Sequence, residues 1–239
     1  MKLKTFTAAA MMITLPLLAG CGGGGGDAPP APIMKGFWAG TTGTVQTSAI
    51  VLASGDSWLV FQENNITTRF ARLQSQASGS GYSSTGTQYL LQSGTTEPAS
   101  ATGTFTEKSA ISGAMTATSG STTLGLAYNS RYETAAKLTD AVGRWTSSFG
   151  GGSSVLTMDV SVSGALSGTS TTACTYDGTL QPRTADPAVF DVNFTETCLV
   201  GASRNLSGVA TVNAAKTSLF FAATTADKAS GALFEGQKP

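Results

Sequence analysis

The stretch Leu156-Thr-Met-Asp-Val-Ser-Val162 decides the fold class, because every second residue in it is apolar. Successive side chains of a β-strand point to opposite faces of the sheet, so this alternation is typical of a strand with one buried and one wet face. We therefore expect a half-buried strand at 156–162, and the same pattern recurs on both sides of it.

Similar candidate strands follow one another along most of the chain. They are Ala49–Ala53, Ser57–Phe61, Thr67–Leu73, Gln88–Gln92, Gly103–Glu107, Ser121–Tyr128, Thr171–Thr175, Val189–Thr195, Leu206–Val212, Ser218–Ala223 and Ala232–Phe234. Turn-prone residues join them at Ser54–Asp56, Ser78–Gly81, Gly150–Gly152, Asp177–Gly178 and Pro182–Pro187. Short strands at intervals of about 8 to 12 residues with such turns predict an antiparallel β-sandwich or an up-and-down β-barrel.

The composition agrees with an all-β fold and excludes several classes of enzyme. Of the 239 residues, 27 are Ser and 36 are Thr, 12% are charged and 41% are apolar. Threonine suits a pleated, half-exposed surface. The chain has no histidine, which excludes Ser-His-Asp hydrolases, Cys-His proteases and histidine-based zinc sites. We expect no enzymatic activity, no metal and no cofactor.

A repeated Gly-x-Trp motif divides the folded part into two domains. Gly36-Phe-Trp38 and Gly143-Arg-Trp145 lie 107 residues apart, and each leads a β-rich block. Recurrence at a domain-sized interval indicates internal duplication. We therefore expect two small tandem antiparallel domains, barrels or sandwiches, at 33–130 and 143–239.

The segment between these domains breaks the strand pattern. Leu138, Ala141 and Val142 stand at positions i, i+3 and i+4, which predicts a short helix. We assign residues 131–142 to a helical connector.

The N-terminal segment has the pattern of an export signal. Lys2 and Lys4 precede an apolar stretch that ends at Leu18, and small residues lead from there to Cys21. About 13 apolar-leaning residues are too few to span a hydrocarbon core of about 30 Å. We expect a signal peptide at 1–20, followed by a Gly/Pro-rich tether at 21–32.

The residues Leu18-Ala-Gly-Cys21 resemble the lipobox of bacterial lipoproteins. This resemblance implies that the signal is cut before Cys21 and that this cysteine carries acyl chains, of the palmitate kind, which anchor the protein to a membrane. Gly22 in place of Asp is similar to the class sorted to the outer membrane. With the Gly-rich tether and the doubled Gly-x-Trp motif, the chain resembles proteobacterial outer-membrane lipoproteins, on either the periplasmic or the cell-surface face.

Two further cysteines remain once Cys21 is assigned to the lipid. Cys174 and Cys198 form an even pair in an exported chain, and we expect a disulfide between adjacent antiparallel strands. Closure of this loop would stabilise the domain by about 3 to 4 kcal/mol on the chain-entropy model. The alternative, a redox or metal-binding thiol pair, lacks C-x-x-C spacing and further ligands.

Motifs for nucleophilic catalysis or phosphate binding do not occur in the chain. A pair of carboxylates remains formally open to glycoside hydrolysis. The candidates are Asp159 and Asp191, at outward positions of their strands, where solvated charges are the usual interpretation. Asp177, beside Gly178, is interpreted as a turn residue.

The two tryptophans of the repeated motif have two interpretations. Calycins, the superfamily of lipocalins and avidins, carry Gly-x-Trp on their first strand, and the motifs at Trp38 and Trp145 are similar to it. The resemblance implies that each tryptophan closes one end of a barrel, either packed in the core or as the floor of a ligand pocket. A barrel of eight strands has room for its own side chains or one small ligand.

These observations favour a non-enzymatic lipid-anchored envelope lipoprotein that acts through protein binding or a structural role at the outer membrane. The expected partners are the membrane, through the lipid anchor, and an envelope or host protein. The alternative is a calycin-like carrier of a small hydrophobic ligand. Nucleic acid is not an expected partner, because the chain has no basic stripe.

Overall fold

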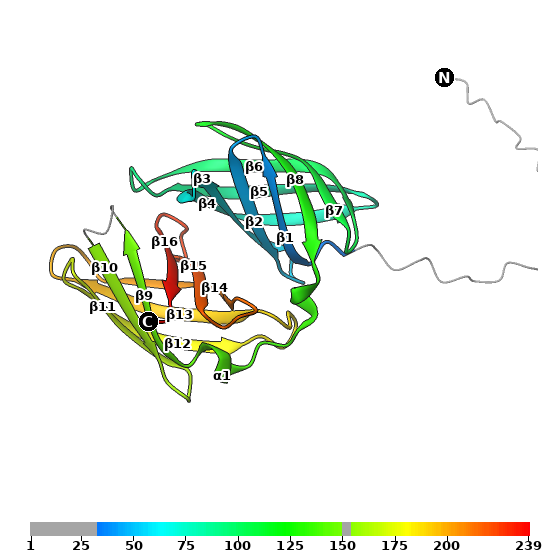
Figure 1. The fold of residues 1–239 in the computed structure, drawn as a ribbon. Coiled ribbons are helices and arrows are strands. Elements are labelled where there is room, and N and C mark those ends of the chain that lie inside the picture. The colour runs from blue at the N-terminus through cyan, green and yellow to red at the C-terminus, as the bar shows by residue number, and fades with distance from the viewer. Residues whose placement is uncertain (1–32, 150–153) are drawn as a thin grey trace, which may run out of the picture. The chain divides into compact units, whose positions relative to one another are not determined.

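The computed structural model describes residues 33–149 and 154–239, so the predicted signal peptide, Cys21, the tether and the turn at Gly150–Gly152 lie outside the described residues. Residues Ala31–Pro239 belong to one compact unit. Two closed antiparallel barrels follow one another along this unit, each built as an up-and-down meander (Figure 1). The predicted all-β class with two barrel domains is therefore confirmed, and each domain is a barrel rather than a sandwich.

The first barrel contains eight strands: β1 Gly36–Thr42, β2 Val45–Val51, β3 Asp56–Glu63, β4 Ile66–Ser78, β5 Gly81–Leu90, β6 Thr95–Thr106, β7 Ala110–Ala117 and β8 Gly120–Asn129. The second contains eight more: β9 Gly143–Phe149, β10 Ser154–Val160, β11 Ala165–Ser170, β12 Cys174–Pro182, β13 Phe190–Cys198, β14 Arg204–Val212, β15 Ser218–Thr224 and β16 Gly231–Gln237. In the described residues, no helix is long and apolar enough to cross a membrane.

The alternation at 156–162 produces a strand that is shorter than expected. In β10 the side chains of Leu156, Met158 and Val160 are buried in the second barrel, as the pattern predicts. The strand ends at Val160, because the Ser161 carbonyl accepts a hydrogen bond from the Gly164 amide at 3.0 Å and closes a turn. Val162 therefore lies in the turn and is exposed.

The predicted turn at Asp177–Gly178 is wrong. Both residues lie within β12, where Gly178 pairs with Phe194 of β13. A Cβ atom at Gly178 would lie 2.0 Å from the Asn193 carbonyl oxygen, so glycine is required by close packing of two strands and not by a turn.

The connector contains less helix than predicted. It has one 3₁₀ turn, η1 at Ser130–Glu133, and a single α-helical turn, α1 at Leu138–Ala141. Between them the Ala136 amide donates to the Pro187 carbonyl at 2.5 Å, in the loop between β12 and β13. This amide is therefore not available for the hydrogen bond that it would form within a continuous helix.

The two Gly-x-Trp motifs form the same local structure. The indole of Trp38 donates to the Met34 carbonyl at 3.1 Å, and that of Trp145 donates to the Ala141 carbonyl at 2.7 Å. In both motifs the tryptophan is fully buried and its partner lies four residues earlier. The glycine two residues before each tryptophan has a positive φ, 153° and 123°, which side chains disfavour. The shared local structure of the two motifs supports internal duplication.

The barrels close differently. The first barrel closes where Phe37, Trp38 and Ala39 of β1 pair with β8. In the second, one residue pair joins β9 to β16 within the described part, Thr146 with Gln237.

Three apolar clusters hold the unit together. Two fill the barrel interiors around Trp38 and Trp145. The third lies between the barrels, where outward-facing residues such as Ile50 and Trp58 pack against Val209 and Ala222 of the second barrel. Strand β3 and the second half of β2 are thus buried on both faces, which explains their continuous apolar runs, Trp58–Phe61 and Ala49–Val51.

Candidate binding cleft between the barrels

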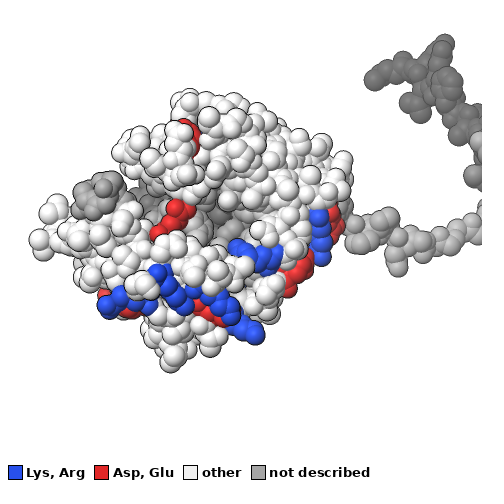
Figure 2. All heavy atoms as spheres, in the orientation of Figure 1, with Lys and Arg blue, Asp and Glu red and all other residues white. Residues whose placement is uncertain are grey.

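A cleft of about 250 Å³ lies between the two barrels. One wall is the outer face of β1, β2 and β3 with the Asn129–Arg131 segment, and the other comes from the β14–β16 side of the second barrel. Its lining combines apolar with polar side chains: Phe37, Trp38, Ala39, Ser48, Ala49, Ile50, Trp58, Val60, Gln62, Asn129, Arg131, Thr211, Asn213, Ser218, Phe220 and Glu235. Figure 2 shows a hollow between the barrels with acidic and basic atoms at its margin, and further charged groups along the lower part of the same face.

Arg131 is the basic group of the cleft. Its Nη1 atom donates to the Thr211 hydroxyl at 3.0 Å and to the Val212 carbonyl, and its guanidinium lies 4.5 Å from the centre of the Phe37 ring. Burial lowers the pKa of Arg131, but an arginine remains protonated in proteins. Among the described residues no acidic group forms an ion pair with it.

Glu235 is the acidic group of the cleft. Its carboxylate accepts hydrogen bonds from the Gln62 amide at 3.1 Å and the Thr67 hydroxyl at 3.3 Å, both from the first barrel. Burial raises the pKa of Glu235, and these two hydrogen bonds oppose the rise. In the parts of the chain described here, Glu235 has no Lys or Arg partner.

Trp58 forms part of the wall between these charges. Its indole nitrogen is buried and has no hydrogen-bond partner among the described residues. The Arg72 guanidinium lies 4.7 Å from the ring centre and is held by Asp56 and by Thr224 of the second barrel. A buried donor without an acceptor costs about 1 to 3 kcal/mol.

Asp186, from the loop between β12 and β13, fixes the barrels against each other. Its fully buried carboxylate accepts hydrogen bonds from the Ala53 amide of the first barrel at 2.7 Å and from the Tyr132 hydroxyl at 2.7 Å. Arg183 donates to the same carboxylate at 3.0 Å. Tyr89 adds another link by donating to the Lys228 carbonyl at 3.0 Å. These hydrogen bonds hold the two barrels that form the walls of the cleft together within one compact unit.

Comparisons with known proteins give no relative. No protein-family model, curated protein or solved structure matches the chain. The cleft is therefore identified by its geometry and chemistry alone.

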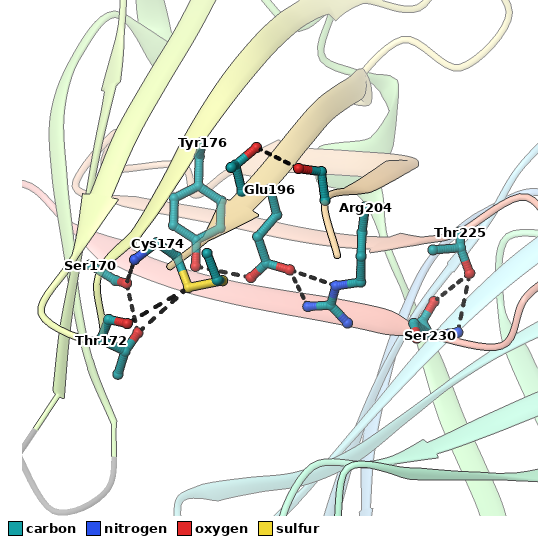
Figure 3. A network of polar contacts seen from close by, with 11 residues as sticks. Ser170, Thr172, Cys174, Tyr176, Glu196, Arg204, Thr225 and Ser230 are labelled. Carbon is teal, nitrogen blue, oxygen red and sulfur yellow. Dashed lines mark hydrogen bonds and ion pairs between the residues drawn. A yellow bond between two sulfur atoms is a disulfide. The ribbon is translucent and has the colours of Figure 1, made fainter. Parts of the chain in front are cut away.

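The cysteine pair expected to form a disulfide is brought together. Cys174 of β12 is directly opposite Cys198 of β13, and their sulfur atoms lie 1.96 Å apart. Figure 3 shows the polar network beside them, in which Glu196 accepts from Tyr176 at 3.1 Å and from Arg204 at 2.7 Å. Glu196 and both sulfur atoms lie within 4.8 Å of one another, but the sulfur atoms are bonded to each other.

The two carboxylates considered for glycoside hydrolysis are not brought together. Asp159 lies on β10 and Asp191 on β13, with two strands between them in the barrel. Each is partly exposed and forms an ion pair with an arginine, Arg144 and Arg183 respectively.

The barrel-end tryptophans are packed in the core. Inside the first barrel the structure contains a cavity of about 20 Å³, close to the volume of one water molecule. Trp38 also belongs to the lining of the cleft. A small apolar ligand thus has more room between the barrels than inside the first one.

The cleft residues Arg131 and Glu235 were not singled out by the sequence analysis. The sequence carried only an indirect signal for the cleft: Trp58-Leu-Val-Phe61 is apolar at consecutive positions rather than alternate ones. Such a run indicates a strand that is buried on both faces, and hence a surface covered by another part of the chain.

Proposed function

We propose that this chain is a non-enzymatic, lipid-anchored envelope lipoprotein that acts by binding another polypeptide in the cleft between its barrels. The observation that carries the binding role is the pair of partly buried charges, Arg131 and Glu235, that lie in one cleft and have no ionic partner among the described residues. Buried charges are normally paired, so a partner that supplies the missing charges accounts for both.

Support for the anchor comes from the lipobox resemblance at Leu18–Cys21 and from the tether that follows it. The test is expression of the full chain in a Gram-negative host fed with labelled palmitate. We expect label in the wild-type protein and in the outer-membrane fraction, and none in Cys21→Ser. Label that persists in Cys21→Ser would contradict lipidation at this residue.

The binding role is tested by photo-crosslinking in the same cells. A photoreactive amino acid replaces Phe220, which lines the cleft, and in a matched control it replaces Leu199, which is 86% exposed on a turn of the second barrel. We expect a discrete protein adduct from position 220 that is lost on adding Arg131→Gln, and none from position 199. Equal adducts from both positions would contradict binding in the cleft.

Protease treatment of intact cells then decides which face the protein occupies. Cleavage of the wild-type chain indicates surface display and a host partner, whereas protection indicates a periplasmic partner.

A further inference from the structure

The two charges without an ionic partner in the described part of the chain lie beside different strands of the cleft wall, Arg131 beside β1 and Glu235 beside Gln62 of β3. Phe37, Ile50 and Trp58 form one row across β1, β2 and β3, and the Arg131 guanidinium lies over the Phe37 ring. Gln62, which binds Glu235, comes four residues after Trp58 on β3. Four residues of strand correspond to about 13 Å along β3, and Phe37 lies a further two strand spacings, about 10 Å, across the sheet from Trp58.

Arg131 presents an unused edge for a carboxylate. Both of its hydrogen bonds to the protein come from Nη1, which leaves Nε and Nη2 without a partner among the described residues. These two N–H groups form the side of the guanidinium that binds a carboxylate through two parallel hydrogen bonds. Stacking on Phe37 holds the plane of the group in place.

Glu235 presents a carboxylate for a cation. Its two partners, Gln62 and Thr67, are neutral donors, so its negative charge is solvated by hydrogen bonds but not neutralised. An ammonium group of a ligand would supply the missing charge.

The wall between the two charges suits a peptide backbone. Ile50, Val60 and Phe220 provide apolar surface, and the hydroxyl groups of Ser48 and Ser218 and the amide of Asn213 keep hydrogen-bonding capacity for peptide groups. A single amino acid is too short to reach both charges, because one carbon atom separates its ammonium from its carboxylate. An extended chain advances about 3.3 to 3.6 Å per residue, so at least four residues are needed to cover the 13 Å along β3.

We propose that the cleft binds a short extended peptide with free ends, its carboxylate on the Nε–Nη2 edge of Arg131 and its ammonium group on Glu235. This inference rests on the proposed binding function and names its ligand class. The cleft volume of about 250 Å³ is below the range of about 300 to 1,000 Å³ typical of drug-sized ligands.

The test is calorimetric titration of the full chain in detergent with tetra-alanine, with its N-acetylated and C-amidated forms, and with free alanine. We expect tetra-alanine to bind and free alanine not to bind. Blocking either end should weaken binding by about tenfold or more, because each block removes one charge-assisted contact.

Two variants assign each end of the peptide to its residue. Arg131→Gln should weaken tetra-alanine binding by about tenfold and make the protein indifferent to C-amidation, as a double-mutant cycle requires for a direct contact. Glu235→Gln should do the same for N-acetylation. Arg144→Gln is the matched control, since Arg144 is exposed and pairs with Asp159 outside the cleft.

Near-UV circular dichroism verifies the fold of each variant. If Arg131→Gln is unfolded, Arg131→Lys replaces it, because lysine keeps the positive charge but cannot form two parallel hydrogen bonds to a carboxylate. Absence of tetra-alanine binding to the folded wild-type chain at millimolar concentration would overturn the inference. So would equal affinity for free and blocked peptides. If the crosslink at position 220 is still formed, the binding function stands and the peptide-end assignment alone fails.

Discussion

The Tyr132 hydroxyl donates a hydrogen bond of 2.7 Å to Oδ1 of Asp186, and both residues are buried. Tyr132 belongs to the connector, and the same carboxylate oxygen accepts the Ala53 amide of the first barrel. The connector and both barrels thus meet at one buried carboxylate.

Asp186→Asn should destabilise the compact unit by about 3 kcal/mol, because it leaves Arg183 without its buried partner and replaces an acceptor of three hydrogen bonds. The measurement is the urea midpoint of the full chain in detergent. Asp159→Asn is the control, since Asp159 pairs with Arg144 at an exposed position, and its midpoint should stay unchanged. Equal midpoints for the two variants would show that Asp186 does not join the barrels.

Stability should fall at alkaline pH. Burial, followed by the hydrogen bond to Asp186, raises the pKa of Tyr132 above its ordinary value of 10.0, and burial followed by the charge of Glu196 raises the pKa of Tyr176 to about 12. A raised folded-state pKa gives stability that is complete below the unfolded value and is lost as pH rises above it.

We therefore expect the unfolding midpoint to be flat from neutral pH to about pH 9 and to fall above about pH 10, where tyrosines of the unfolded chain ionise. Denaturant midpoints at each pH, with tyrosinate absorbance in parallel, measure this. Tyr132→Phe should show a smaller fall. A midpoint that rises above pH 10 would contradict the assignment.

Gly178→Ala should destabilise the second barrel by about 2 to 3 kcal/mol, because the added methyl group meets the Asn193 carbonyl and the Phe194 Cα atom. Gly125→Ala is the matched control on β8, where the nearest atom to the added Cβ is Thr42 Oγ1 at 3.8 Å. Thermal unfolding of both variants measures the difference. If both melt alike, the two strands have room to separate at Gly178.

Joint replacement of Cys174 and Cys198 by serine should lower stability by about 3 to 4 kcal/mol, the loop-closure value for a sequence separation of 24 residues. Dithiothreitol should lower the melting temperature of the wild-type protein to that of the double variant and should leave the double variant unaffected. A reductant effect that is equal in both proteins would exclude the disulfide as its cause.

Much of the fold could be predicted because it depends on patterns among residues that are close in the sequence. Alternation identifies β10, since Leu156, Met158 and Val160 reach the same core. The Gly-x-Trp repeat predicts two domains, since each tryptophan needs only its own strand and the residue four positions earlier.

The errors and omissions have a common physical origin in contacts between distant parts of the chain. Asp177–Gly178 has the composition of a turn, but β13 comes so close that glycine is needed inside a strand. Arg131 and Glu235 belong to different segments and share no local pattern. Their proximity to one cleft follows from the packing of one barrel on the other, which periodicity within single strands does not encode.

The equivalent indole-to-carbonyl hydrogen bonds of Trp38 and Trp145, each called an indole hook below, bear on the ancestry of the protein. Each hook is self-contained, because its acceptor carbonyl lies four residues earlier in the same chain segment. A single ancestral barrel would have had the complete hook, whereas the cleft takes its basic and acidic groups from opposite sides of the junction. If the two barrels arose by duplication, the barrel fold is older than the cleft, because the cleft forms only where two barrels belong to one chain.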